Sequence, residues 1–368
     1  MAQVDDAQGI FQERDGPGRT RVLDSIPAPR SLLRRTNRPT ESILYAFYSD
    51  RFVLPLPAGH RFPMVKYGQL RERVGRTLPG VRLREPEAAT DGVLALAHHP
   101  DWVARLADGR LRPDEIRAIG FPWSPEMVER SRRSAGASVE AARGALRDGA
   151  AANLAGGTHH ASADRGEGFC CFNDLAVAAR LMQAERRVRR VAIVDLDVHQ
   201  GNGTAEILAR DDSVFTLSIH GERNYPFRKA VGDLDVALPD GTGDDAYLDA
   251  LERALAELAR RFAPDLILYL AGADVYEGDR LGRLSLTRPG IAERDRRVFA
   301  FARRAGLPVA VAMGGGYCPR IEDIVEIHLE TVRQAWSHAH GSMSAMPESL
   351  HAARAEQGAG ANPGTENR

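Results

Sequence analysis

Three side chains able to bind a metal ion follow a short apolar run near the middle of the chain. Residues 191–194 are valine, alanine and isoleucine, and Asp195, Asp197 and His199 come after them at alternating positions. Residues two apart on an extended chain point the same way, so these three side chains share one face. Two carboxylates and an imidazole suit zinc or a similar divalent ion. The alternative is a strand-end loop whose aspartates cap a helix.

Two adjacent histidines, His159 and His160, follow a Gly-Gly turn at positions 156–157. An imidazole changes charge near neutral pH, so a histidine beside a reaction centre is a good acid or base. Tandem histidines alone are weak evidence because they also occur in surface loops, and the pair at 98–99 is interpreted that way. The position of His159 and His160 just after a short apolar stretch makes them the better candidates for proton transfer.

A third carboxylate and a tyrosine follow two further apolar runs. Asp274 comes after Ala-Gly-Ala, and together with Asp197 and His199 it gives three protein ligands that leave coordination positions open. That number is typical of a catalytic zinc site and not of a structural one. Tyr317 follows three glycines at 314–316, where the backbone can pass close to a ligand and the hydroxyl can reach a developing oxyanion. A glycine run by itself is more often a tight turn.

The candidates above lie at the ends of apolar runs that alternate with amphipathic stretches. The runs predict strands at 191–197, 214–220, 266–271 and 309–313, after a shorter apolar stretch at 153–155. The amphipathic stretches predict helices at 174–187, 204–210, 246–262, 291–305 and 322–337. A further helix is expected to begin at Ser124-Pro125-Glu126. This alternation predicts an α/β fold with a parallel sheet and helices on both faces, in which sites form at the carboxyl ends of the strands.

The chain of 368 residues is interpreted as one domain with an extension at each end. Residues 1–40 are polar, rich in Arg, Pro and Gly, and without periodicity, which predicts a flexible N-terminal extension. Residues 41–340 contain no linker, repeat or low-complexity break, so they are expected to form a single catalytic domain. Residues 341–368 are expected to form a disordered C-terminal tail.

Composition argues against several classes of protein. The formal net charge of −1 gives no reason to expect nucleic-acid or membrane-surface binding, and no apolar run is long enough to span a membrane. The N-terminus lacks the charged and apolar regions of a signal peptide. The 3 cysteines, two of them adjacent, do not make a disulfide framework, so a cytoplasmic location is expected. Monomer and homodimer both stay open.

Four motifs together give the chain a family resemblance. They are Gly-Gly-x-His-His-Ala, Asp-Leu-Asp-Val-His-Gln-Gly-Asn-Gly, Gly-Ala-Asp followed by Gly-Asp-Arg-Leu-Gly, and Gly-Gly-Gly-Tyr. In this order, over roughly residues 45–335, they resemble the histone deacetylase family. The Gln-Gly-Asn variant and the segment 277–282 are most similar to its class IV branch and related bacterial proteins. The resemblance implies the arginase–deacetylase α/β fold, with a parallel sheet of about eight strands, and hydrolysis of an acyl group from a lysine-like amine.

The resemblance also implies which residues hold metal ions. Asp197, His199 and Asp274 would be the ligands of a catalytic zinc ion. A structural potassium ion would be held near Asp195, by the hydroxyl of Ser218 and by the carbonyls of Ile219, Asp197 and His199.

The resemblance also implies the roles of the catalytic residues, and it gives proton transfer to His160. It would act as the general base toward water and then protonate the leaving amine, while His159, oriented by Asp195, would act mainly through its charge. Tyr317 would hydrogen-bond the carbonyl oxygen. Asn202 stands where most classes have the aspartate partner of the second histidine. An asparagine orients His160 but does not stabilise an imidazolium as a carboxylate would, which predicts a lower pKa for His160 than in the aspartate-bearing classes.

An acyl-lysine side chain would reach the metal through a narrow apolar channel. By resemblance Phe169 forms one wall, Tyr225 is preferred over Phe227 for the facing wall, and Leu281 is a further channel residue. An acid at the position of Leu281 would favour a polyamine cation, so leucine argues for acyl-lysine. Gly156 is expected to offer a carbonyl near the pocket floor. The alternative is that Phe169 and Leu281 are ordinary core residues.

Three other functions compete with that of a zinc-dependent lysine deacylase. A two-manganese ureohydrolase on the same fold is poorly supported, because positions 200 and 201 carry no carboxylate. A non-catalytic protein that binds acylated ligands would be favoured by loss of Tyr317 or of either histidine, and all three are present. An acetylpolyamine hydrolase, acting on a small acylated amine, stays open. So does the acyl group, acetyl or long-chain fatty acyl, because Thr158 replaces a tryptophan found in many family members and is compatible with a larger pocket.

Overall fold

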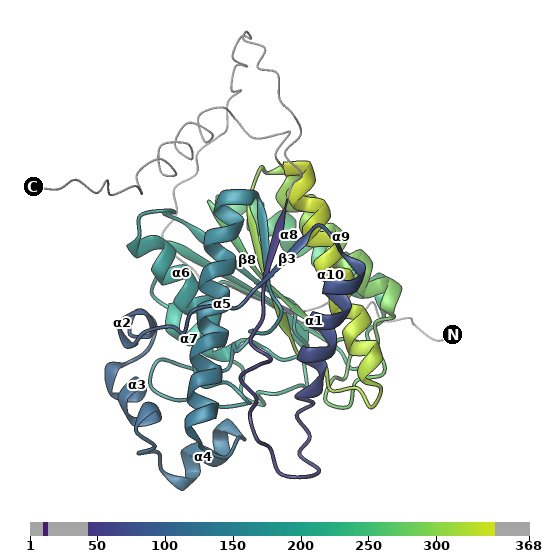
Figure 1. Cartoon of the computed structure of the whole chain (residues 1–368). Coiled ribbons are helices and arrows are strands. Elements are labelled where there is room, and N and C mark those ends of the chain that lie inside the picture. Colours follow the sequence, from purple (N-terminus) through teal and green to yellow (C-terminus); the bar gives the residue numbers. More distant parts are fainter. Residues whose placement is uncertain (1–9, 14–42, 343–368) are drawn as a thin grey trace, which may run out of the picture.

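The computed structural model describes residues 10–13 and 43–342, shown in colour in Figure 1. Its strands are β1 (Ile10–Glu13), β2 (Leu44–Phe47), β3 (Val81–Arg84), β4 (Ala150–Asn153), β5 (Val191–Asp195), β6 (Val214–Gly221), β7 (Leu234–Leu238), β8 (Leu266–Gly272) and β9 (Val309–Gly314). Its helices are α1 (Val65–Thr77), α2 (Asp91–Leu94), α3 (Pro100–Ala107), α4 (Pro113–Ile119), α5 (Pro125–Asp148), α6 (Asp174–Ala184), α7 (Asn202–Leu208), α8 (Asp244–Arg261), α9 (Arg288–Arg304) and α10 (Ile321–Ser342).

All the described strands belong to one sheet in the order β1-β7-β6-β5-β8-β9-β4-β2-β3. Strands β2 to β9 run parallel to their neighbours, and β1 pairs antiparallel with β7 at one edge. The predicted parallel sheet of about eight strands is therefore confirmed, with one short antiparallel strand added. Because β5, β8, β9 and β4 are consecutive, their carboxyl ends lie side by side at one edge of the sheet.

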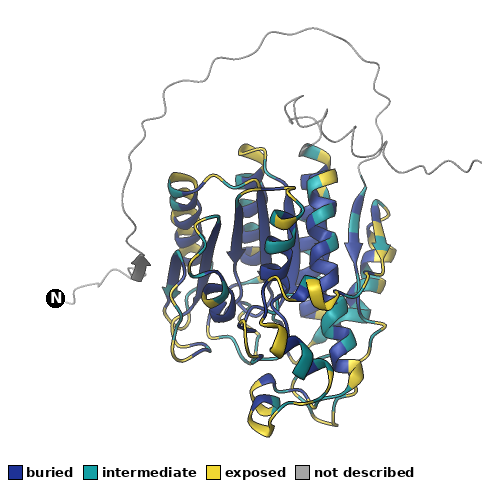
Figure 2. Ribbon diagram, turned by 90° about the vertical axis from the view of Figure 1, so that its left-hand side faces the viewer, coloured by how far each residue is buried: buried dark blue, intermediate teal, exposed yellow. Residues whose placement is uncertain are grey.

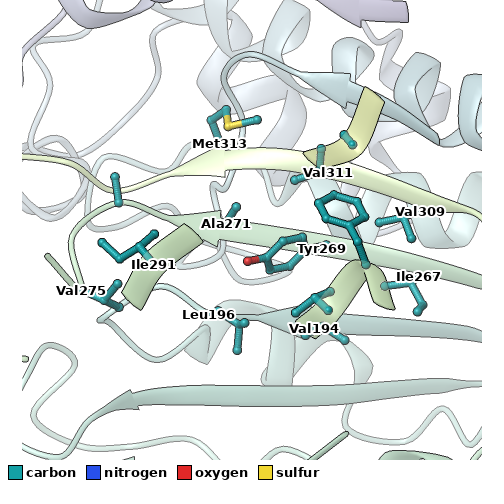
Figure 3. Packing of buried hydrophobic residues seen from close by; sticks show 14 of the residues in the cluster. Val194, Leu196, Ile267, Tyr269, Ala271, Val275, Ile291, Val309, Val311 and Met313 are labelled. Atoms are coloured by element: carbon teal, nitrogen blue, oxygen red, sulfur yellow. The ribbon is translucent and has the colours of Figure 1, made fainter. Parts of the chain in front are cut away.

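The sheet is buried on both faces, and each face has its own apolar core. In β5, Ala192 and Val194 belong to one cluster while Val191 and Ile193 belong to the other. Figure 3 shows the first cluster, where Val194, Tyr269 and Val311 from three neighbouring strands lie close together. Burial on two faces explains the unbroken apolar runs of these strands, since no position along them faces water. In Figure 2 exposed residues lie mainly on the outer sides of the helices and in loops, and β3 at one edge of the sheet also has exposed positions.

Helices cover the two faces in two groups. Residues of α1, α8, α9 and α10 contribute to the first cluster, and residues of α3, α4, α5 and α6 contribute to the second. The predicted starts of α5 and α6 are confirmed: the side chain of Ser124 accepts a hydrogen bond from the Met127 amide, and that of Asn173 accepts one from the Ala176 amide. None of the described helices is long and apolar enough to cross a membrane.

Element bounds differ from the sequence expectation by a few residues at several helix ends, and more clearly at the following positions. The apolar stretch predicted at 153–155 is the end of β4 and the turn after it, because the strand itself occupies 150–153. The strand predicted at 191–197 ends at Asp195, where the chain turns out of the sheet toward the site. Within the predicted flexible segment 1–40, residues 10–13 form β1, and α10 extends into the predicted tail as far as Ser342. The rest of both extensions lies outside the described residues.

Candidate metal-dependent active site

A pocket of about 460 Å³ opens at the edge of the sheet where β4, β5, β8 and β9 end. Most of the residues predicted for the site line it, and they come from the loops that follow these strands or from segments packed against them. The predicted residues on its wall are Gly156, His159, His160, Phe169, Asp197, His199, Tyr225, Leu281 and Tyr317. Asp195, Asn202 and Asp274 lie directly behind this wall, in contact with residues that form it.

Asp197, His199 and Asp274 form a compact group with the geometry of a metal site. One potential ligand atom from each lies within 4.8 Å of the other two. Asp197 and Asp274 are buried, whereas the side chain of His199 keeps 12% of its exposure on the pocket side. The ring nitrogen Nδ1 of His199 lies 2.9 Å from Asp197 Oδ1 and 3.2 Å from Asp274 Oδ2. The three side chains therefore converge on one point.

The chemistry of this group fits a divalent cation. Asp274 Oδ2 is fully buried, and its contact with His199 Nδ1 at 3.2 Å lacks the geometry of a good hydrogen bond, which is costly for a carboxylate oxygen unless a cation is nearby. Burial and the neighbouring charge of Asp197 raise the pKa of Asp274 to about 7. Without a metal ion, a single imidazole would have to balance the negative charge of two buried carboxylates. The open side of the group toward the pocket leaves room for water or substrate at the metal.

Backbone contacts hold the two aspartates in place. The Asp197 amide donates to Asp195 Oδ1 at 3.1 Å, and the Val198 amide donates to Asp274 Oδ1 at 3.0 Å. The end of β8 passes very close to this loop, since a Cβ added at Gly272 would lie 2.4 Å from the Cα of Asp197. Glycine at 272 is thus required for the close approach that brings Asp274 beside Asp197.

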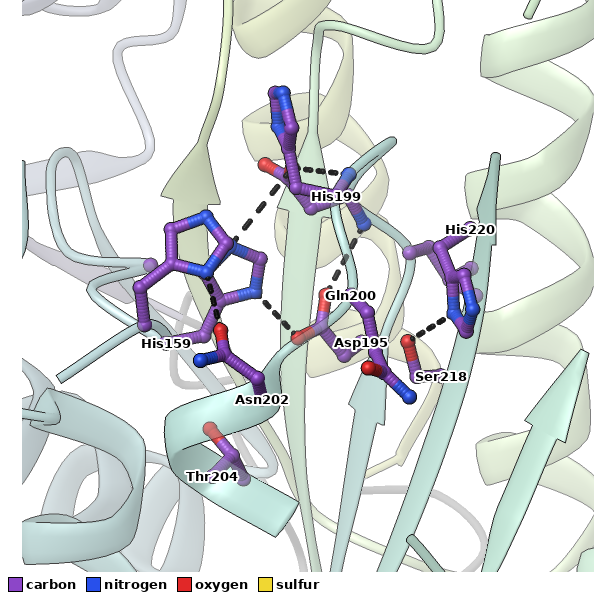
Figure 4. Close-up of polar contacts among 12 residues, drawn as sticks. His159, Asp195, His199, Gln200, Asn202, Thr204, Ser218 and His220 are labelled. Atoms are coloured by element: carbon purple, nitrogen blue, oxygen red, sulfur yellow. Dashed lines mark hydrogen bonds and ion pairs between the residues drawn. The ribbon is translucent and has the colours of Figure 1, made fainter. Parts of the chain in front are cut away.

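The paired histidines have different partners, and Figure 4 shows His159 close to Asp195. His159 Nδ1 lies 2.6 Å from Asp195 Oδ2, and His160 Nδ1 lies 2.7 Å from Asn202 Oδ1. Burial opposes protonation of His159, but the charge and hydrogen bond of Asp195 outweigh it and raise the pKa of His159 to about 9. Burial and the neighbouring imidazoles lower the pKa of His160 well below its ordinary value. His160 is therefore neutral and able to accept a proton, while His159 is cationic.

Tyr317 is positioned by two contacts that the motif does not reveal. Its backbone amide donates to Asp279 Oδ2 at 2.6 Å, and the preceding turn is held by Lys66, whose ammonium group donates to the carbonyls of Gly315 and Gly316. Burial raises the pKa of the Tyr317 phenol well above its ordinary value, so the hydroxyl keeps its proton and can donate it in a hydrogen bond. Lys66 is one of only two lysines in the chain, which is the one weak signal of its role in the sequence.

Aromatic side chains form the channel toward the metal group. The ring of Tyr225 packs edge-on against His160 with centroids 4.9 Å apart, whereas Phe227 is 87% exposed at the rim. The ring of Phe169 packs 5.1 Å from the rings of both Phe62 and Phe121. Phe169 and Leu281 both keep partial exposure on the pocket wall, so the alternative that they are ordinary core residues is not supported. Phe62 was not among the predicted residues, because nothing in its local sequence distinguishes it.

Two of the residues expected to hold potassium, Ser218 and Ile219, lie in β6 beside Asp195. Ser218 pairs with Asp195 across β5 and β6, and Figure 4 shows Asp195 between His159 and Ser218. The hydroxyl of Ser218 lies 2.9 Å from Nδ1 of His220, a buried imidazole whose pKa is lowered by burial to about 3. Ile219 follows Ser218 within β6.

The interpretation of positions 98–99 as a surface pair is wrong for His98. His98 is 3% exposed, and it bridges two segments: its Nδ1 lies 2.9 Å from the Ser162 carbonyl, and its Nε2 accepts from the Asn173 amide at 2.8 Å. Burial lowers its pKa to about 4. His99 is the residue that caps α3. The local sequence could not show this difference, because both partners of His98 are more than 60 residues away.

Comparison with known proteins identifies the family to which this fold and site belong. Residues 60–332 match the histone deacetylase domain, and the chain belongs to the histone deacetylase family. It is 32% identical to histone deacetylase 2 of Arabidopsis thaliana, with 79% of this chain and 78% of the relative covered. It is 30% identical to an acetylpolyamine amidohydrolase of Burkholderia pseudomallei, with 73% and 79% covered.

The fold is also similar to that of solved histone deacetylase structures. A crystal structure of a histone deacetylase homologue complexed with SAHA superposes with a TM-score of 0.70 at 25% identity, covering 82% of this chain and 84% of that one. The predicted arginase–deacetylase fold is therefore confirmed. Membership of this family supports a deacetylase, a hydrolase of amide bonds.

Proposed function

We propose that this protein is a zinc-dependent amidohydrolase that removes an acetyl or similarly short acyl group from lysine side chains. The observation that supports this most directly is the convergence, in one pocket, of the group formed by Asp197, His199 and Asp274 with the neutral His160 and the protonated Tyr317. Zinc is the proposed ion because one imidazole and two carboxylates in a site open on one side suit zinc, as they also suit similar divalent ions. Asp195, Ser218 and Ile219, with the carbonyls of Asp197 and His199, are proposed to hold a potassium ion.

The reaction follows from the positions of the side chains. A zinc ion held by the three ligands would supply Lewis acidity that polarises the amide carbonyl and makes water more acidic. His160 accepts the proton of the attacking water and passes it to the amine as the carbon–nitrogen bond breaks. The products are a carboxylic acid and an amine, and transfer of the acid proton to the amine gives carboxylate and ammonium. His159, kept cationic by Asp195, stabilises the negative charge that develops. The Tyr317 hydroxyl donates a hydrogen bond to the carbonyl oxygen as that oxygen becomes an oxyanion.

Charge on the pocket wall favours acyl-lysine over an acetylated polyamine. Apart from the metal group and the paired histidines, the charged side chains that line the pocket are all cationic: Arg61, Lys66, Arg223 and Arg283. A polyamine carries further ammonium groups that these residues would repel, whereas a peptide backbone or an acidic flanking residue would not. The apolar Leu281 on the same wall offers a polyamine no counter-ion. Similarity to an acetylpolyamine amidohydrolase keeps that activity as the second candidate.

The space next to the channel favours a short acyl group. A second cavity of about 40 Å³ shares Gly156, Thr158 and Phe169 with the main pocket. It has room for only about three water molecules, which suffices for a methyl group but not for a long fatty chain unless side chains move. Long-chain fatty acyl-lysine, suggested by the class IV resemblance, is therefore the less favoured substrate.

Hydrolysis of three matched compounds tests the proposal. Zinc-loaded protein is given one lysine peptide carrying an acetyl group, the same peptide carrying a myristoyl group, and an acetylated diamine. We expect the acetyl peptide to have the highest kcat/KM, and no activity above background for protein stripped of metal. The highest kcat/KM on the diamine would favour the polyamine alternative. Binding of the acetyl peptide without turnover, with zinc present in stoichiometric amount, would contradict catalysis.

A further inference from the structure

A chain of hydrogen bonds links His160 to an acid that the family motifs do not include. Asn202 Oδ1 lies 2.7 Å from Nδ1 of His160, and the amide nitrogen of the same side chain donates to a carboxylate oxygen of Glu167. The same carboxylate accepts a hydrogen bond from the hydroxyl of Tyr225 on the channel wall. Glu167 is half-buried, in the loop that leads to Phe169, and Asn202 is 4% exposed.

The carboxylate of Glu167 determines the orientation of the Asn202 side-chain amide. An asparagine side chain presents an acceptor on one side and a donor on the other, and by itself it can face His160 with either. An ionised carboxylate only accepts hydrogen bonds, so the NH₂ group of Asn202 must face Glu167. The carbonyl oxygen of Asn202 is then left facing His160.

The orientation of the amide in turn decides the tautomer of His160. A carbonyl oxygen only accepts, so Nδ1 of a neutral His160 must bear the hydrogen, and Nε2 is left with a free lone pair. In the opposite orientation, the NH₂ group of Asn202 would donate to Nδ1 and place the hydrogen on Nε2. A histidine in that form cannot accept a proton at Nε2.

We infer that Glu167 is a positioning residue for the general base: acting through Asn202, it holds His160 in the tautomer whose Nε2 can accept a proton. The inference rests on the proposed function for its catalytic consequence, but not for the tautomer itself. It gives this chain a His–Asn–Glu arrangement in which the negative charge lies one hydrogen bond further from the imidazole than a directly bonded aspartate would place it.

A double-mutant cycle separates this role from a merely structural one. We expect Glu167→Ala in the zinc-loaded enzyme to lower kcat for an acetyl-lysine peptide at least about tenfold with KM changed less than about twofold. Asn202→Ala is expected to lower kcat by at least as much, and the double variant no further, because Glu167 acts through Asn202. Glu222→Gln, at an exposed acid that does not line the pocket, should leave kcat unchanged. Additive losses in the double variant would overturn the inference.

The tautomer is read independently of activity from the nitrogen chemical shifts of His160 in labelled protein. The wild type should show hydrogen on Nδ1, and Glu167→Ala should shift the population toward hydrogen on Nε2. Tyr225→Phe, which removes only the second hydrogen bond of Glu167, should leave the tautomer as in the wild type. An unchanged tautomer in Glu167→Ala would contradict the inference. Because this readout needs no turnover, failure of the proposed function would not be mistaken for failure of the inference.

Discussion

At the scale of single residues, Asp274 is the side chain of the site that most needs a nearby cation. It is completely buried, and its Oδ2 has no hydrogen bond of good geometry. We expect Asp274→Asn to weaken zinc binding at least about tenfold, because a neutral amide oxygen is a poorer ligand than a carboxylate. Competition with a chromogenic chelator measures the affinity directly. The matched control is Asp164→Asn at an exposed position, and equal zinc affinity in both variants would argue against Asp274 as a ligand.

Tyr317 offers a second test at the same scale. Replacing it with phenylalanine removes one hydroxyl and keeps the ring that packs beside Phe169. Loss of one oxyanion donor is expected to lower kcat about 100-fold or more while KM changes little, since the hydrogen bond strengthens only as charge develops. Zinc content should be unchanged. A rise in KM with constant kcat would mean that the hydroxyl serves substrate binding alone.

At the scale of elements, Asn173 connects a helix start to the active-site loop. Its side-chain oxygen caps α6, and its amide nitrogen donates to the carbonyls of His159 and Ala161 and to the hydroxyl of Thr204. One residue thus holds the strand-end loop with the paired histidines against the start of a helix.

We expect Asn173→Ala to lower the free energy of unfolding by more than the roughly 1 kcal/mol of a lost cap, and to lower kcat as well, because the loop with His159 is released. Ser124→Ala at the start of α5 is the matched control, since it loses a cap and no loop contact. Urea unfolding and steady-state kinetics of both variants give the comparison. If both lose the same stability and neither loses activity, the loop does not depend on Asn173.

At the scale of the whole molecule, buried neutral histidines link stability to pH. His98 accepts the Asn173 amide at Nε2, so protonating it would place two hydrogens against each other. Its pKa is lowered to about 4 in the folded state, below the value near 6.5 of the unfolded chain. Between these values the unfolded state binds the proton and the folded state does not. Stability contributed by the neutral form is therefore complete above about pH 6.5 and is lost as pH falls toward 4.

We expect the free energy of unfolding to fall by up to about 3 kcal/mol from this group between pH 7 and pH 4. His98→Gln cannot take up the proton, so its stability should depend less steeply on pH than that of the wild type. Urea unfolding of both proteins at several pH values isolates the contribution of His98 from that of other groups. Parallel pH profiles would show that His98 titrates alike in both states.

The sequence by itself predicted the class of fold and two of the three residues of the candidate metal group, because both predictions depend on local periodicity. Alternating positions after residues 191–194 place Asp197 and His199 on one face, and unbroken apolar runs identify strands buried on two faces. Loops at the carboxyl ends of neighbouring parallel strands must meet, which brought Asp274 and Tyr317 into the prediction. Short strands such as β2 and β3 gave no such signal, because four residues are too few to show a period.

Only the tertiary structure decided the partners that lie outside the sequence motifs. Lys66 reaches the turn before Tyr317 across 249 residues of sequence, and Glu167 meets Asn202 because the loop before Phe169 folds over the start of α7. The difference between His98 and His99 is equally invisible in the sequence. How the helices and the sheet pack determines which residues far apart in the chain become hydrogen-bond partners. Small differences in this packing therefore determine whether a polar side chain binds a ligand, positions a catalytic group or only stabilises the fold.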